Sequence, residues 1–136
     1  MLAHENPNAT LSDDDFLARY EAHAVEHFSH EDHVRMAFAY ATRGGVAAAV
    51  RGARRIRDLA ETLGAPDKYH DTLTVAWARI VAQLAVRSRA TTFEEFLDAH
   101  PELLRRDLLA AHYTHGVLFS SAARAGFVEP DLAPLP

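Results

Sequence analysis

The chain contains no cysteine, and this absence removes several classes of chemistry at once. Disulfide bonds, thiolate zinc sites and a cysteine nucleophile are all excluded. Glycine and proline are sparse as well, with 6 of each among 136 residues, and neither a glycine-rich phosphate loop nor a dinucleotide-binding fingerprint is present. Histidines and carboxylates are therefore the first metal ligands and proton carriers to consider.

Positive charge is also in short supply. Lys and Arg number 14 against 19 Asp and Glu, which gives a formal net charge of -5 at pH 7. This balance disfavours nucleic-acid binding, which requires a positive surface that neutralises phosphates. No apolar run is long enough to span a bilayer, and the first residues do not resemble a secretory signal. We expect a single cytoplasmic domain without nucleic-acid or membrane partners.

Histidine, by contrast, is present in excess, with nine copies. Its side chain titrates near neutral pH and is the commonest metal ligand in proteins. Three of the nine, His27, His30 and His33, fall within the seven residues "HFSHEDH". Their function depends on whether they face solvent, the protein interior or one another.

Apolar residues recur at helical spacing along most of the chain, and no strand pair or internal repeat is apparent. A serine or threonine followed three residues later by an acid predicts helix starts after Ser12, Ser29 and Thr92. Gly44–Gly45 and Gly64 predict helix ends. The expected helices span residues 13–27, 30–43, 46–63, 65–87, 93–99, 101–113 and a last turn within 119–126.

The predicted architecture is all-α, a compact bundle of four to six helices. Residues 1–11 are polar and carry an early proline, so we expect them to form a flexible arm. Residues 12–136 should form one helical domain. Its last segment, 126–136, holds three prolines and is expected to be extended on the surface.

Two of the clustered histidines continue the apolar face of helix 30–43. Residues four apart lie on the same face of a helix. His30 precedes Val34 by four residues, and His33 precedes Ala37 by four. Both side chains are therefore expected to point inward at the first turn.

A third histidine, His70, continues the apolar face of helix 65–87, three residues before Leu73 and seven before Trp77. Short connections make neighbouring helices antiparallel. Helices 30–43 and 65–87 should then run parallel and begin at the same end of the bundle. The three inward histidines are therefore expected at one level.

Three neutral imidazoles from two helices, with coordination positions left open, suit one divalent transition metal: Zn, Fe, Mn or Cu. We predict His30, His33 and His70 as its ligands. Glu31 and Asp71 lie beside these histidines in the sequence. Either carboxylate could supply a fourth ligand, orient a histidine or act as a general base.

Further side chains are expected at the same end of the bundle. Helix 13–27 is antiparallel to the helix that follows it, and helix 101–113 should return to that end. Possible additional ligands on these helices are His27, His23 and His112. The aromatic residues predicted to wall a pocket for a small-molecule substrate are Tyr69, Trp77 and Phe38.

Two other interpretations compete with a metal site. A lone inward histidine is more often a hydrogen-bonded core residue than a ligand. Two converging helix N-termini with protonated histidines would instead form a pocket for phosphate or carboxylate. The neighbouring acids, Glu26, Glu31, Asp32 and Asp71, disfavour such an anion site. The arginines of helix 46–63 are expected to form a solvated helix face.

Three segments also carry a resemblance: "FSHEDHVRMAFAY", "YHDTLTVAWARI" and "GVLFSSAARAGFVEPDLAPLP". In these the chain resembles a functionally unassigned family of small bacterial all-α proteins, over most of its length from Phe28 onward. The motifs F-x-H-x-D-H and Y-H-x-T-L-T contain the three inward histidines. The type of site is similar to that of DinB and YfiT metal-binding four-helix bundles. In that group three histidines from two helices hold one metal, and several members are metal-dependent transferases or hydrolases.

The sequence thus predicts a small metal-dependent enzyme that acts on a small molecule by Lewis-acid, activated-water or redox chemistry. The alternative is a non-enzymatic helical module that binds a small ligand or a partner, with structural or pH-sensing histidines. An exposed apolar helix face would also permit a homodimer.

Overall fold

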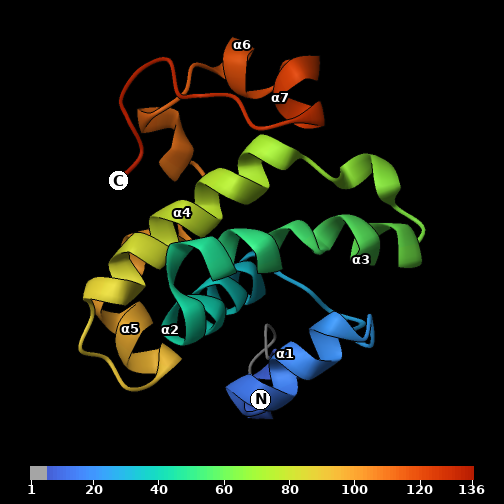
Figure 1. Cartoon of the computed structure of the whole chain (residues 1–136), viewed down its shortest axis with the longest axis vertical. Helices are drawn as coiled ribbons and strands as arrows, with labels where there is room; N and C mark the ends of the chain where they lie inside the picture. The colour runs from blue at the N-terminus through green and yellow to red at the C-terminus, as the bar shows by residue number, and fades with distance from the viewer. Residues whose placement is uncertain (1–5) are drawn as a thin grey trace.

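The computed structural model describes residues 6–136, and within this range the chain is all-α, without a strand (Figure 1). The α-helices are α1 (Asp13–Glu21), α2 (His30–Arg54), α3 (Ile56–Thr62), α4 (Asp71–Arg87), α5 (Phe93–Ala99), α6 (His115–Leu118) and α7 (Ser121–Ala125). The 3-10 helices are η1 (Pro7–Thr10), η2 (Pro66–Lys68), η3 (Pro101–Leu104) and η4 (Leu108–Ala111). The predicted fold class is confirmed. None of the described helices is both long and apolar enough to cross a membrane.

Helix α1 begins where the sequence predicts but ends six residues early. The Ser12 side chain accepts a hydrogen bond from the Asp15 N–H at 3.1 Å. At the other end His23 adopts a left-handed conformation with φ 56°. The Ala24 N–H bonds the Arg19 carbonyl at 2.8 Å, which closes a Schellman motif. His23 thus occupies a position that is usually glycine. Because no glycine marks the end of α1 in the sequence, helical spacing alone predicted a longer helix.

Helix α2 begins with a full capping box, as predicted. The Ser29 hydroxyl accepts from the Asp32 N–H at 3.3 Å, and the Asp32 carboxylate accepts from the Ser29 N–H at 2.8 Å. As the glycine pair predicts, the helical geometry is interrupted at Gly45, which has φ 78° and ψ -167°, so α2 consists of two helices joined at a sharp turn. Tyr40 packs against Gly52, where an added Cβ would lie 2.3 Å from the tyrosine ring. The two halves of α2 therefore fold back on each other, as the expected antiparallel arrangement requires.

Helix α4 begins six residues later than predicted. Gly64, with φ 75°, ends the preceding helix as expected, but Pro66 then starts the short η2. His70 is the N-cap of α4, and Asp71 is its first residue. The extensive pairing of α4 with α2 forms the centre of the molecule, and α7 packs near the start of α4 (Figure 1).

The segment 101–113 is not one helix but two 3-10 turns, η3 and η4. Its buried leucines are Leu103 and Leu109. These are six residues apart, a spacing that would place them about 120° apart around an α-helix. The neighbouring Leu104 is exposed by 44%. Breaking the helix allows both buried leucines to face the same core.

The C-terminal segment 126–136 is non-helical and lies against the helices, as predicted. The Thr72 hydroxyl donates to the Gly126 carbonyl at 3.1 Å and accepts from the Val128 N–H at 3.0 Å. The Tyr113 hydroxyl donates to the Val128 carbonyl at 2.8 Å. The Thr72 bonds fasten the segment to α4, and the Tyr113 bond fastens it to the residues that follow η4.

The expected flexible arm, residues 1–11, lies partly outside the described residues, and the part from residue 6 onward is tied to the core. Asn8 is buried and donates from its side chain to the His27 carbonyl at 2.8 Å. Arg35 donates to the carbonyls of Asn8 and Leu11 at 2.8 and 2.6 Å. The described part of the arm is therefore an integral layer of the domain.

Candidate functional site

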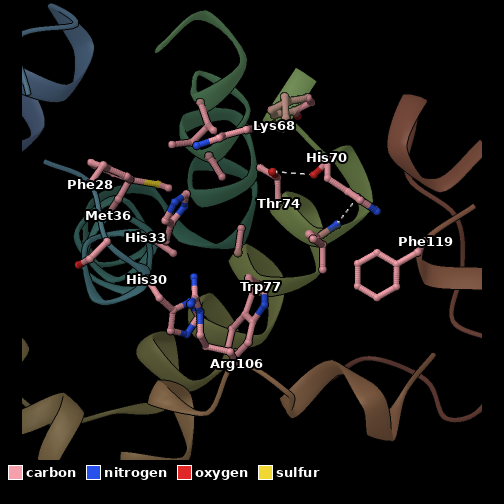
Figure 2. A pocket seen from close by; sticks show the side chains of 17 residues that line it. Phe28, His30, His33, Met36, Lys68, His70, Thr74, Trp77, Arg106 and Phe119 are labelled. Atoms are coloured by element: carbon pink, nitrogen blue, oxygen red, sulfur yellow. Dashed lines mark hydrogen bonds between the residues drawn. The ribbon is translucent and has the colours of Figure 1, made fainter. Parts of the chain in front are cut away.

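A cavity of about 560 Å³ lies between α2, α4 and the C-terminal region (Figure 2). Its volume falls within the range of small-molecule sites, roughly 300–1,000 Å³. The apolar part of its wall comes from Phe28, Met36, Ala37, Ala53, Ile56, Leu73, Trp77, Ala78 and Phe119. The polar part comes from Ser29, His30, His33, Lys68, Tyr69, His70, Thr74 and Arg106. The three inward histidines of the sequence all reach this cavity.

His33 lines the cavity from the first turn of α2. Its ring packs edge-on against Phe28, with centroids 4.8 Å apart, and it forms no hydrogen bond with a described residue. Burial, together with the positive charge of His30 and Arg106, lowers the pKa of His33 to about 4 although Asp32 opposes the shift. At neutral pH the ring is therefore uncharged, with a lone pair available to a ligand.

His30 lies one helical turn before His33 and is held at one nitrogen only. Nε2 lies 2.8 Å from the Leu103 carbonyl oxygen. Because a carbonyl can only accept, Nε2 carries the proton and Nδ1 keeps its lone pair. The ring packs edge-on against Trp77 at 4.6 Å. Burial lowers the pKa of His30, so this ring is also neutral.

His70 is bound at both ring nitrogens. Nδ1 accepts from the Leu73 N–H at 3.1 Å, which caps α4, and Nε2 donates to the Leu118 carbonyl at 2.7 Å. Figure 2 shows the ring directed toward Phe119 and away from His33. His70 therefore joins the start of α4 to the C-terminal region.

The predicted three-histidine set is thus only partly assembled. His30 and His33 lie on one wall, and each has at least one ring nitrogen without a hydrogen-bond partner among the described residues. His70, by contrast, uses both ring nitrogens in hydrogen bonds with the backbone. Within residues 6–136 no group of three metal-ligating side chains gathers at one point. The available donors are two neutral imidazoles, and the metal site stays a prediction.

Asp71 faces away from the cavity into an ion pair. Its carboxylate accepts from Arg54 at 3.3 and 3.1 Å and from the Tyr69 hydroxyl, and Arg57 lies 3.9 Å away. Two arginines that were expected to be solvated therefore hold the first residue of α4. Asp71 is engaged in fixing helices and is not among the residues that line the cavity.

The other acids near the histidines are also directed elsewhere. Glu31 lines a second hollow, formed by the N-terminal segment and α5. Asp32 is buried, and its carboxylate accepts hydrogen bonds from the Ser29 N–H in the helix cap and from the Asn6 side chain at 2.9 Å. Glu26 is exposed. Among the described lining residues of the central cavity, none is acidic.

The three possible additional ligands lie outside the cavity. His23 pairs with the Thr62 hydroxyl at 3.0 Å. His27 is exposed, with Nε2 3.7 Å from the Asp32 carboxylate. His112 donates from Nδ1 to the Ala133 carbonyl at 3.0 Å and so holds the C-terminal segment.

Two of the three predicted pocket aromatics line the cavity. Tyr69 and Trp77 do so, and the Arg57 guanidinium lies 4.8 Å from the centre of the Tyr69 ring. Phe38 instead packs in the core against Phe96, with centroids 4.7 Å apart. It lies on α2 but is not part of the cavity wall.

Lys68, Arg106 and Phe119 are among the wall residues that were not predicted from the sequence. Phe119 is half exposed, with its ring 6.0 Å from that of His70 and 4.7 Å from that of His115. Lys68 immediately precedes the Y-H-x-T-L-T motif, which was the only local signal. Arg106 had none, because the two 3-10 turns that direct it toward α2 were expected to be one helix.

The chain was compared with protein-family models, curated proteins and solved structures, and none of them matches it, so the site is interpreted from its own residues.

Proposed function

We propose that the protein binds a small organic anion with an apolar body in the central cavity. One observation supports this above all: the wall combines apolar side chains with two cations, Lys68 and Arg106, and includes no carboxylate among its described residues. Burial of the apolar body supplies affinity, while the cations attract and orient an anionic group.

The sequence suggested that nearby acidic residues would repel an anion. The positions of these side chains remove that objection. Asp71 is neutralised by Arg54, and Asp32 is satisfied within its helix cap. Glu31 lines the second hollow on a different part of the surface. The charge nearest the ligand is therefore positive, although the chain as a whole is acidic.

A thermal-shift and calorimetric screen of medium-chain carboxylates and aryl carboxylates tests this proposal. We expect saturable binding that weakens with ionic strength and falls about tenfold in Arg106→Gln. Arg89→Gln is the matched control, because Arg89 is exposed and outside the cavity wall. Equal affinity of both variants for every ligand, or no binding by the wild-type protein, would contradict the proposal.

A second candidate is the metal-dependent enzyme predicted from the sequence, and the histidine nitrogens favour it. His30 Nδ1 and the His33 ring have no partner among the described residues, and the two rings lie on successive turns of one helix. Both are neutral, so no proton must be displaced before binding. A bound divalent metal would polarise an anionic substrate held in the same cavity.

Metal analysis of the untagged protein by mass spectrometry tests this candidate. We expect one metal per chain after reconstitution, and its loss in His33→Gln. Retention of metal in His70→Asn would limit the ligands to His30 and His33, whereas loss would support the full three-histidine set. Sub-stoichiometric metal in both the purified and the reconstituted wild-type protein would overturn the candidate.

A further inference from the structure

Two cationic side chains border the cavity at separate places. Lys68 comes from η2, ahead of α4, and Arg106 comes from the link between η3 and η4. Figure 2 shows them on opposite sides of His33, with Arg106 beside His30 and Trp77. They are brought together by tertiary structure alone, because 37 residues separate them in the chain.

Neither cation has a carboxylate partner within the described residues. The adjacent Arg105 pairs with Asp107 at 3.3 Å, but Arg106 forms no ion pair, and Lys68 forms none. Other cations of the molecule do find acids, as Arg35 does with Asp13 at 3.0 Å. Other cations without an acid partner in the described part of the chain, such as Arg51 and Arg89, lie outside the cavity wall, whereas Lys68 and Arg106 line it and are available to an anionic ligand.

His33 lies between the two cations (Figure 2). The cavity also has an apolar part, which includes Met36, Ala37, Leu73 and Trp77. Both cations are exposed at the surface, so their charged groups remain hydrated until a ligand arrives. A ligand with one anionic group would leave one cation unused, and a compact polyanion would leave the apolar wall unused.

We propose that the ligand carries an anionic group at each end of an apolar body, with one group held by Arg106 and the other by Lys68. This inference rests on the proposed anion-binding function and specifies the class of molecule. Straight-chain dicarboxylates are the simplest members of the class, and monocarboxylates of equal length are the matched comparison.

Isothermal titration of untagged protein with diacids and monoacids of 6 to about 12 carbons tests the inference. At one optimal length the diacid should bind at least about tenfold more tightly than the monoacid. Arg106→Gln and Lys68→Gln should each reduce diacid affinity to that of the monoacid, while Arg89→Gln leaves it unchanged.

The monoacid provides a second readout. Because it has one charged group, its affinity should fall in Arg106→Gln and not in Lys68→Gln. Equal affinities for diacid and monoacid at every length would overturn the two-ended ligand while leaving the anion site in place. Failure of both series to bind would instead overturn the proposed function itself.

Discussion

Arg54 donates hydrogen bonds to both carboxylate oxygens of Asp71, from Nε at 3.3 Å and from Nη2 at 3.1 Å. The pair joins the second half of α2 to the first residue of α4. The carboxylate is almost fully buried, whereas the guanidinium is about half exposed. Asp71, which was predicted to lie beside a metal, thus links α2 to α4, the two helices that form much of the cavity wall.

Arg54→Met should lower the free energy of unfolding by about 1–3 kcal/mol, because it deprives a buried carboxylate of its main partner. Urea denaturation at pH 7 measures this change. Arg51→Met is the control, since Arg51 is exposed on the same helix. Equal losses in the two variants would mean that the ion pair adds nothing beyond general helix effects.

The same pair should make stability depend on acid pH. Burial alone would raise the pKa of Asp71, but the hydrogen bonds from Arg54 and Tyr69 outweigh it and hold that pKa below its usual value. A lowered pKa stabilises the fold above the unfolded value of about 3.9, and this contribution is lost as pH falls through the folded value. The difference between wild type and Arg54→Met should therefore shrink below about pH 4.

His33 should make the free energy of unfolding rise with pH, over a higher pH range than Asp71 does. Its pKa in the folded protein is about 4, against about 6.5 when unfolded. Between these values the unfolded chain binds the extra proton, so unfolding free energy increases with pH by up to about 1.4 kcal/mol per unit. His33→Gln should flatten this slope. An NMR titration of the ring with a midpoint near 6.5 would contradict the prediction.

Substitutions at His70 should distinguish how much each of its two hydrogen bonds contributes to the free energy of unfolding. Asparagine can still cap α4 by accepting from the Leu73 N–H but cannot reach the Leu118 carbonyl, and alanine does neither. We expect losses of about 1 kcal/mol for His70→Asn and about 2–3 kcal/mol for His70→Ala. Thermal denaturation of both variants gives the order, and equal losses would show that the cap contributes nothing.

Two glycines provide a matched test of packing. A Cβ at Gly52 would lie 2.3 Å from the Tyr40 ring, while nothing lies within 4 Å of a Cβ at Gly116. Gly52→Ala should therefore cost about 1–3 kcal/mol despite the better helix propensity of alanine. Gly116→Ala should be neutral or slightly stabilising. Destabilisation of both variants to the same extent would refute the packing argument.

Three helix starts could be predicted from the sequence because capping is a local interaction. Ser12, Ser29 and Thr92 each accept a hydrogen bond from the backbone N–H three residues later, as the spacing indicated. Helix ends were only partly predictable. The break in α2 at Gly45 was indicated by the glycine pair. The left-handed conformation of His23, whose ring pairs with the distant Thr62 hydroxyl, was not indicated by any local pattern.

The inward direction of His30 and His33 followed from helical periodicity, and both line the cavity. What each nitrogen contacts did not follow, because the partners are distant backbone carbonyls. The Leu103 carbonyl is 73 residues from His30, and the Leu118 carbonyl is 48 residues from His70. The same limit hid Arg106, whose approach to α2 depends on the break between η3 and η4.

These distant carbonyls also set an order of events during protein synthesis. The walls contributed by α2 and α4 leave the ribosome first, whereas Arg106 and Phe119 follow much later. A nascent chain that has not yet released these residues lacks part of the cavity wall and the acceptors that fix two histidine rings. The cavity wall is therefore complete only after the segment from Leu103 to Phe119 has been synthesised and has packed against α2 and α4.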